Sequence, residues 1–202
     1  MIQFEYVDLG LPSGLKWAKC NVGAEKETDY GDYFMWGSTE PNTADECTWV
    51  SYKYCDGPYD TLTKYNTSSL YGENPDNITI LESVDDAASQ IMGGDWRMPT
   101  KDEIQELIDN TTNQWVTNYN GSGVNGRKFI SKTDTSKYIF IPAAGSCYNG
   151  SVGDVGNYCR VWSSSLDASN PYGAWFLGFF SGGCYVNVIK RCYGLSVRGV
   201  RN

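Results

Sequence analysis

Short apolar and aromatic runs, each bounded by turn-forming residues, constrain the fold of this chain more than any other feature. The 202 residues include 22 Gly and 15 Tyr, and Asn, Asp, Ser and Thr fill many of the intervals between the runs. Aromatic and β-branched residues favour strands, while Gly, Pro and Asn favour turns, so many short strands are expected rather than a helical bundle. The expected strands cover residues 4–10, 15–18, 30–37, 124–130, 138–142, 161–165, 174–181, 185–189 and 195–200.

Two segments carry helix signals. Residues 83–92 begin with Ser83 and an acidic first turn, and two glycines follow them, so a helix is expected there. The second signal is stronger, because Thr100 and Glu103 have the spacing of a capping box and precede an apolar stripe of helical period. This second helix is expected to end near residues 110–113.

Helices set among many short strands predict an α+β fold, and the chain length suits one domain over residues 1–202. Residues 38–80 are rich in Thr, Asn, Asp, Pro and Tyr and show no sustained period. We interpret them as a long, partly ordered insertion, with Trp49, Tyr52 and Tyr54 as its aromatic anchors.

The charge and hydropathy disfavour two classes of partner. The net charge is −8, with only 16 Lys and Arg in total and no basic cluster, which disfavours nucleic-acid binding. No apolar run approaches the roughly 20 residues of a membrane span. No signal peptide is visible at the start, so export is expected to use another route or a leader that this chain lacks.

Histidine and cysteine usage limits the chemistry. Without any His, a Ser-His-Asp or Cys-His arrangement and the mixed zinc sites are impossible. The seven cysteines show no CxxC pair; Cys47 could pair with Cys55, but several other pairings are equally open. We therefore expect free thiols with one or two disulfides, no cofactor and no metal site, and the compartment stays open.

Ten motifs in order along the chain resemble one known family. They are VDLGLPSG (7–14), WA (17–18), CNVGA (20–24), YGDYF (30–34), WG (36–37), GDWRMPT (94–100), NG (125–126), IPAAG (141–145), WSSS (162–165) and SVR (196–198). Together they resemble the Fibrobacter succinogenes major paralogous domain, which is common in gut Bacteroidetes and their phages. The resemblance implies a C-type-lectin-like fold of the formylglycine-generating-enzyme type, with two main helices and short antiparallel strands.

Several members of this group resemble variable proteins of diversity-generating retroelements, in which error-prone reverse transcription alters adenines in a C-terminal coding segment. Asn codons varied at their adenines never encode Lys, Glu, Gln, Met or Trp. These five types number 31 in residues 1–146 but only three in residues 147–195, where the upstream frequency would give about 10. The same 49 residues hold four of the seven cysteines. We therefore expect a scaffold over residues 1–146 and a variable ligand-binding region over residues 147–195.

Strand alternation refines the expected site. In residues 174–181 it places Trp175, Leu177 and Phe179 on one face and Phe176, Gly178 and Phe180 on the other. The family resemblance implies that Leu177 and Phe179 belong to the framework and that Phe176, Gly178 and Phe180 are outward, varied positions. Trp162, Trp175, Arg191, Gly194, Val197 and Arg198 are assigned to the scaffold. The predicted ligand-binding positions are Tyr148, Cys159, Arg160, Tyr172, Phe176, Gly178, Phe180, Cys184, Tyr185, Val188, Ile189, Lys190, Cys192, Tyr193 and Leu195.

The leading hypothesis is a retroelement-diversified receptor-recognition domain on a phage virion or bacterial cell surface. Its partner would be an unidentified protein or glycan on a cell surface, and its oligomeric state stays open. The alternative is a fixed carbohydrate- or protein-binding adhesion module of the same fold, since the aromatic excess also permits sugar stacking.

We expect no enzymatic activity. In an enzyme of the formylglycine-generating type the reactive pair would be Cys184 and Cys192. Both lie in the region expected to be variable, residues 147–195, where a catalytic residue would not be kept. The carboxylate pair Asp85–Asp86 is explained by an acidic first helical turn. Weak calcium signals at Asp29 with Asp32, and at Asp76 with Asn77, match no known loop.

Overall fold

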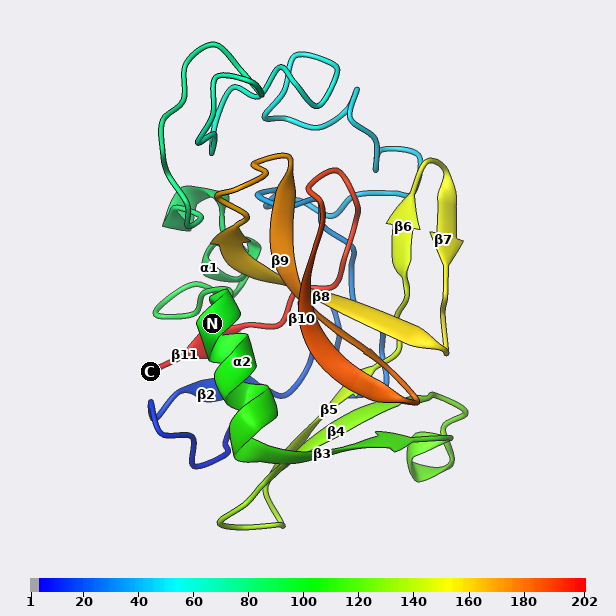
Figure 1. The fold of residues 1–202 in the computed structure, drawn as a ribbon. Helices are drawn as coiled ribbons and strands as arrows, with labels where there is room; N and C mark the ends of the chain where they lie inside the picture. Colours follow the sequence, from blue (N-terminus) through cyan, green and yellow to red (C-terminus); the bar gives the residue numbers. More distant parts are fainter. Residues whose placement is uncertain (1–3) are drawn as a thin grey trace.

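The computed structural model describes residues 4–202 as a sheet-rich α+β fold whose strands pair antiparallel (Figure 1). One sheet has the order β1 (Tyr6–Asp8), β2 (Lys16–Ala18), β11 (Val200–Arg201), and a second has the order β3 (Thr111–Val116), β4 (Gly126–Ser131), β5 (Tyr138–Pro142). The third has the order β10 (Gly183–Lys190), β9 (Gly173–Phe180), β8 (Tyr158–Leu166), and β6 (Ser146–Tyr148) pairs with β7 (Ser151–Gly153). Because β11 pairs with β2, the two ends of the described chain lie together. Residues 1–3 of the expected 1–202 domain lie outside the described part.

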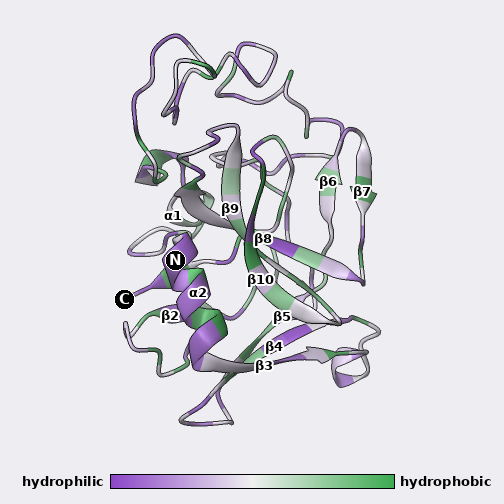
Figure 2. Cartoon of the chain, in the orientation of Figure 1, coloured by the Kyte–Doolittle hydropathy of each residue, from purple (hydrophilic) through white to green (hydrophobic). Residues whose placement is uncertain are grey.

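The capping-box prediction is confirmed. Helix α2 (Lys101–Asn110) begins after Thr100, whose hydroxyl accepts from the Glu103 amide at 3.3 Å while the Glu103 carboxylate accepts from the Thr100 amide at 2.8 Å. Its apolar stripe is buried, and the helix is accordingly a mixture of hydrophilic and hydrophobic residues in Figure 2. Strand β3 follows at once, where the sequence predicted only the end of the helix.

The predicted start of the first helix is wrong. Residues Ser83–Asp85 form a short 3₁₀ turn, η1, and α1 covers only Ala87–Met92. The N-cap is Asp86, whose carboxylate accepts from the Ser89 amide at 2.9 Å. The helix stops at Gly93, which adopts a positive φ as expected for a terminating glycine. A second short 3₁₀ turn, η2, covers Tyr119–Gly121.

Two predicted strands, at residues 30–37 and 195–200, are not continuous strands. Phe34 makes a single bridge to Leu195, and the Trp36 amide donates to the Arg191 carbonyl at 3.0 Å instead of continuing that ladder. Residues 195–200 likewise bond in turn to several segments, and only Val200 enters a sheet. The central residues of both runs are buried, but no single partner strand follows either run.

The sheet of β8, β9 and β10 lies between two hydrophobic clusters, which confirms the predicted alternation in β9. Leu177 and Phe179 belong to a cluster with α2 and β4, whereas Phe176 belongs to the cluster on the other side with Trp162. Figure 1 shows α2 beside this sheet and the β3–β5 sheet below it. The neighbouring β10 is an edge strand and is only half-buried.

Residues 38–80 form a long irregular segment, drawn in cyan and green at the top of Figure 1. Of its three expected aromatic anchors, Tyr52 and Tyr54 are buried and Trp49 is half-buried. The Tyr54 ring packs edge to face against the rings of Tyr52 and of the buried Tyr65, with centroid distances of 5.9 Å and 5.4 Å. Within residues 4–202, no helix has the length and apolar character needed to cross a bilayer.

Arg191 fixes this irregular segment against the rest of the molecule. Its guanidinium is fully buried and donates to the Tyr52 hydroxyl at 2.8 Å and to the carbonyls of Lys64, Tyr65 and Pro171 at 3.0, 2.9 and 2.8 Å. It also lies 5.0 Å from the ring centroid of Trp36. The scaffold assignment of Arg191 is consistent with this burial.

Arg198 has the same role near the chain ends. It is fully buried and donates to the Asn21 side chain and to the carbonyls of Ala18, Lys19 and Phe140 at 2.5–3.0 Å. Burial lowers the pKa of its guanidinium to about 10. Arg191 thus satisfies carbonyls of segments outside the named strands, whereas Arg198 also bonds the carbonyls of Ala18 in β2 and Phe140 in β5.

Replacing Arg191 by Met should lower the free energy of unfolding by about 3–5 kcal/mol, because several buried acceptors lose their donors. Urea denaturation measures the change. Arg201→Met is the control: it removes a partly exposed pair with Asp95 and should cost about 1 kcal/mol or less. Equal losses in the two variants would contradict the role given to Arg191.

Candidate ligand-binding surface

An open hollow forms where residues 38–80 meet the end of β10. It has a volume of about 400 Å³ and is lined by Trp49, Tyr59, Tyr71, Tyr172 and Lys190. The ring centroid of Tyr59 lies 5.8 Å from that of Tyr172 and 6.4 Å from those of Tyr71 and Trp49. Tyr59 is 49% exposed, so the wall of rings is accessible from solvent. We call this set of five residues the aromatic hollow.

A second hollow of about 390 Å³ shares Tyr172 and Lys190 with the first. Val188, Ile189 and Tyr193 add apolar surface. Asp167 and Asn170, from the turn between β8 and β9, add polar groups. The turn is fixed internally, since the Asn170 amide donates to the Asp167 carbonyl at 3.2 Å and the Gly173 amide to the Asn170 carbonyl at 2.9 Å. The two hollows therefore form one surface with an aromatic and a polar part.

Tyr193 extends this surface toward the β6–β7 hairpin. Its ring stacks on that of Tyr148 with centroids 4.1 Å apart and planes nearly parallel. Farther along the sheet, the Phe180 and Tyr158 rings stack at 5.1 Å, and the Arg160 guanidinium lies 5.1 Å from the Tyr158 ring centroid. These side chains are half-exposed. The surface is thus rich in aromatic rings. It also contains two cationic side chains, Lys190 in the hollows and Arg160 beside Tyr158.

Ten of the fifteen predicted ligand-binding residues are at least partly exposed: Tyr148, Arg160, Tyr172, Phe180, Cys184, Tyr185, Val188, Ile189, Lys190 and Tyr193. Cys184 lies apart from the other nine, because its thiol contacts Asn113 at 3.2 Å on the face that packs toward β3. The remaining nine come from β6, β8, β9, β10 and their connecting turns.

The expected outward position is wrong for the other five residues. Cys159, Cys192 and Leu195 are fully buried, and Phe176 is only 4% exposed. Gly178 is buried under the Tyr185 ring, which a Cβ at that position would strike. Alternation identified the correct strand face, but that face is covered by a second cluster over most of its length, so facing away from one core did not mean facing solvent.

Sequence reasoning missed three of the five residues of the aromatic hollow. Trp49 was expected only to anchor the insertion, and Tyr59 and Tyr71 were not singled out; Asp167 and Asn170 were also missed. The available signal was the density of Tyr in a long loop without a hydrophobic period, since such loops in compact proteins are commonly functional. Nothing local to those residues showed that they meet Tyr172.

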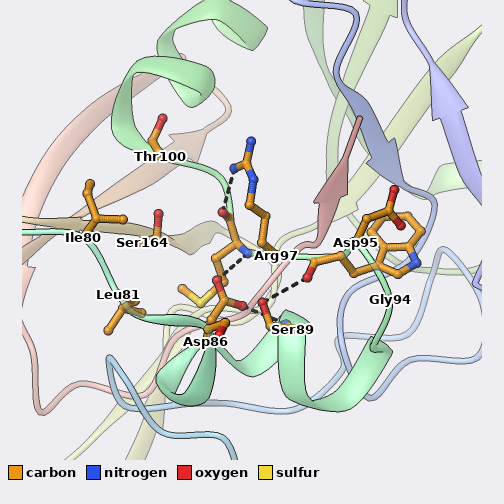
Figure 3. A pocket seen from close by; sticks show the side chains of 12 residues that line it. Ile80, Leu81, Asp86, Ser89, Gly94, Asp95, Arg97, Thr100 and Ser164 are labelled. Carbon is orange, nitrogen blue, oxygen red and sulfur yellow. Dashed lines mark hydrogen bonds between the residues drawn. The ribbon is translucent and has the colours of Figure 1, made fainter.

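The hollow between α1 and the start of α2 is held by internal bonds (Figure 3). It has a volume of about 340 Å³, and Asp86, one of the two carboxylates in its lining, accepts from the amides of Ser89 and Met98 at 2.9 and 2.8 Å. Burial raises the pKa of Asp86. The Ser89 hydroxyl donates to the Trp96 carbonyl at 3.0 Å. Asp86 therefore joins the start of α1 to the segment before α2.

Asp85 has separate partners, so the two adjacent carboxylates do not act as a pair. Lys64, Lys53 and the Tyr65 hydroxyl donate to Asp85 at 2.6, 3.1 and 2.7 Å. Burial by itself raises the pKa of Asp85, but the hydrogen bonds, that of Lys64 first, hold it well below its usual range. This ion-pair network joins η1 to the insertion that carries Trp49, Tyr59 and Tyr71.

The weak calcium signals have structural explanations. The Asp76 carboxylate accepts from three backbone amides, those of Tyr65, Asn66 and Ile78, at 2.7–3.0 Å. Asp29 accepts from the amides of Glu25 and Lys26. In the part of the chain that is described, no group of three or more His, Cys, Asp or Glu residues is arranged to hold a metal ion.

Cys184 and Cys192 lie on opposite sides of the β8–β10 sheet. Cys192 is in the cluster with Phe176, and Cys184 packs against the cluster with Phe179. They do not form the adjacent thiol pair that an enzyme of the formylglycine-generating type would need.

Comparison with known families gives the class of the domain. The model of the Lcl C-terminal domain family matches residues 10–201, nearly the whole chain, and the chain belongs to this family. Membership indicates a surface or binding domain. Neither the curated proteins nor the solved structures contain a significant match.

The Asp85 network predicts a pH-dependent loss of stability. Because the folded-state pKa is lowered, its contribution is present above the ordinary carboxyl value of 3.8 and is lost as the pH falls below it. Asp85→Asn should therefore lower the free energy of unfolding by about 2–4 kcal/mol at pH 7. The difference from the wild type should shrink as the pH falls below about 4.

Thermal unfolding from pH 7 to pH 2.5 tests this. The control is Asp60→Asn, an exposed carboxylate in the same insertion, which should leave stability almost unchanged. A constant difference between Asp85→Asn and the wild type across this range would contradict the network.

Proposed function

We propose that this domain recognises a ligand on another cell surface through the aromatic hollow and the adjoining half-exposed face of β8–β10. The observation that carries the proposal is the meeting of Trp49, Tyr59 and Tyr71 with Tyr172 and Lys190 in one open hollow. Tyr and Trp supply large amphipathic contact areas at a low cost in side-chain entropy, and such residues dominate binding surfaces. Membership of a surface or binding family supports this reading.

A glycan is the second ligand class that a specific observation favours. The negative face of an aromatic ring attracts the weakly positive C–H face of a sugar. Here the rings of Tyr172 and Tyr193 line the same hollow as the carboxylate of Asp167 and the amide of Asn170, which suit the hydroxyls of a saccharide. A protein ligand would use the same rings together with the more apolar Val188 and Ile189.

Diversification of the C-terminal face is the finer part of the proposal. It rests on the resemblance to the Fibrobacter succinogenes major paralogous domain, on the shortage of five residue types in residues 147–195, and on five exposed predicted positions that line one hollow, namely Tyr172, Val188, Ile189, Lys190 and Tyr193. The C-type-lectin-like fold implied by that resemblance agrees with an α+β domain whose terminal strands pair. Burial gives Cys159, Cys192 and Leu195 packing roles, so we propose that these are fixed.

We further propose that binding, not catalysis, is the activity, and that the domain works outside the cell, on a virion or a bacterial surface. The aromatic hollow is lined by rings and one lysine and has no carboxylate pair or nucleophile–base pair in its lining. Such a lining suits recognition better than acid–base or nucleophilic chemistry.

The double variant Tyr59→Ala/Tyr172→Ala should lose at least tenfold in binding affinity, because two ring contacts are removed from the hollow. The probes are an immobilised oligosaccharide array and a panel of intact gut bacteria; whichever binds the wild type is then titrated.

Tyr6→Ala is the control, since Tyr6 is 47% exposed, packs near Trp96 and is not part of the lining of the aromatic hollow. If the double variant binds as tightly as the wild type while Tyr6→Ala binds more weakly, the aromatic hollow is not the ligand-binding site.

The diversification proposal predicts a near-copy of the codons for residues 147–195 in neighbouring DNA, beside a reverse transcriptase gene and differing only at adenines. Sequencing that DNA checks it. The differences should fall on codons for exposed residues such as Tyr172, Tyr185 and Tyr193 and spare the buried Cys192 and Leu195. If no such copy exists, the fixed adhesion module is the better description.

A further inference from the structure

Two buried cysteines that are 100 residues apart meet beneath the surface described above. The sulfur atoms of Cys47 and Cys147 lie 2.8 Å apart, closer than the van der Waals separation of two unbonded sulfurs. Both side chains are fully buried. All seven cysteines, which lie within residues 4–202, are free thiols in the structure. The other five therefore serve as internal comparisons for this pair.

Backbone hydrogen bonds join the segments that carry the two thiols. The Asn149 amide donates to the Cys47 carbonyl, and the Gly150 amide donates to the Ala44 carbonyl, both at 3.0 Å. On the other side, Cys147 exchanges two backbone hydrogen bonds of 2.9 Å with Gly194. A Cβ at Gly194 would collide with both sulfur atoms. The site thus holds the sulfurs together with no side chain between them.

From this geometry we propose that Cys47 and Cys147 form a disulfide that fastens the 38–80 insertion to β6. Each thiol loses one hydrogen as the S–S bond forms. The two electrons and two protons pass to a small-molecule disulfide, such as oxidised glutathione, which is released as two thiols. The reaction proceeds by thiolate attack and exchange through a mixed disulfide.

The electrostatics of the pair suit such an exchange. The hydrogen bond from Cys47 lowers the pKa of the Cys147 thiol, and the same hydrogen bond together with burial raises that of Cys47. Cys147 is therefore the thiol that ionises first. By contrast, burial raises the pKa of Cys159, which faces the other cluster and has no sulfur partner.

The bond would close a loop of about 100 residues that contains Trp49, Tyr59 and Tyr71. Closing a long loop restricts the unfolded chain more than closing a short one, so the stabilising effect is expected to be large. It would also hold Trp49, two residues after Cys47, at the wall of the aromatic hollow. The disulfide itself does not depend on the proposed ligand-binding role.

Peptide mapping of the folded full chain tests the bond. After exposure to oxidised glutathione and blocking of free thiols in denaturant, trypsin should yield the peptides 27–53 and 138–160 joined by one disulfide. Their combined mass should be about 2 Da below the sum of the two free-thiol peptides. Oxidised protein should melt roughly 5–15 °C above protein treated with reductant.

Peptide 138–160 also contains Cys159, so Cys159→Ser is the matched variant. The joined peptide should persist in Cys159→Ser and vanish in Cys147→Ser and in Cys47→Ser. Absence of the joined peptide from oxidised wild type, or its survival in Cys147→Ser, would overturn the proposal. Because the wild-type map alone decides the first point, a variant that fails to fold leaves the test intact.

A second measurement on the same samples, binding to the array and cells, tests the ligand-binding role separately from the disulfide. If the joined peptide forms but the reduced and oxidised proteins bind the array and cells equally, the disulfide stands and only its effect on the hollow is excluded.

Discussion

The hydrogen bonds donated by the buried guanidinium of Arg191 are the interaction on which the rest of this structure depends. The 38–80 insertion has almost no regular secondary structure, so its carbonyls need donors from elsewhere when they are buried. Arg191 supplies those donors to Lys64 and Tyr65, and also to Pro171 in the turn before β9. One side chain thus joins the insertion to the C-terminal sheet, and the aromatic hollow forms where they meet.

Sequence alone predicted those parts of the fold that local chemistry determines. The capping box at Thr100 and Glu103 was correct because its two hydrogen bonds lie within four residues. The alternation of Phe176 and Leu177 was correct because it follows from the pleat. The strand expected around Phe34 failed because its neighbours are distant segments, each meeting it for only one or two residues.

The candidate surface was predicted in part for the same reason. Composition in residues 147–195 identified the right segment, and the side chains of Tyr172, Lys190 and Tyr193 do line the hollows. It could not separate exposed positions from Cys192 or Leu195, whose burial depends on the insertion and on Phe34. Nor could it identify Tyr59 and Tyr71 as the opposite wall, because the contacts that place them join residues about 100 apart.

The central claim is that a rigid scaffold presents a face whose side chains are free to vary. The most direct measurement is protease resistance across a displayed library in which each residue from 147 to 195 is replaced singly. We expect Tyr172, Tyr185, Val188 and Lys190 to tolerate most replacements, and Cys159, Phe176, Arg191 and Leu195 to tolerate few. If the two groups prove equally intolerant, the exposed face is part of the folding core, and the claim of a variable recognition surface is wrong.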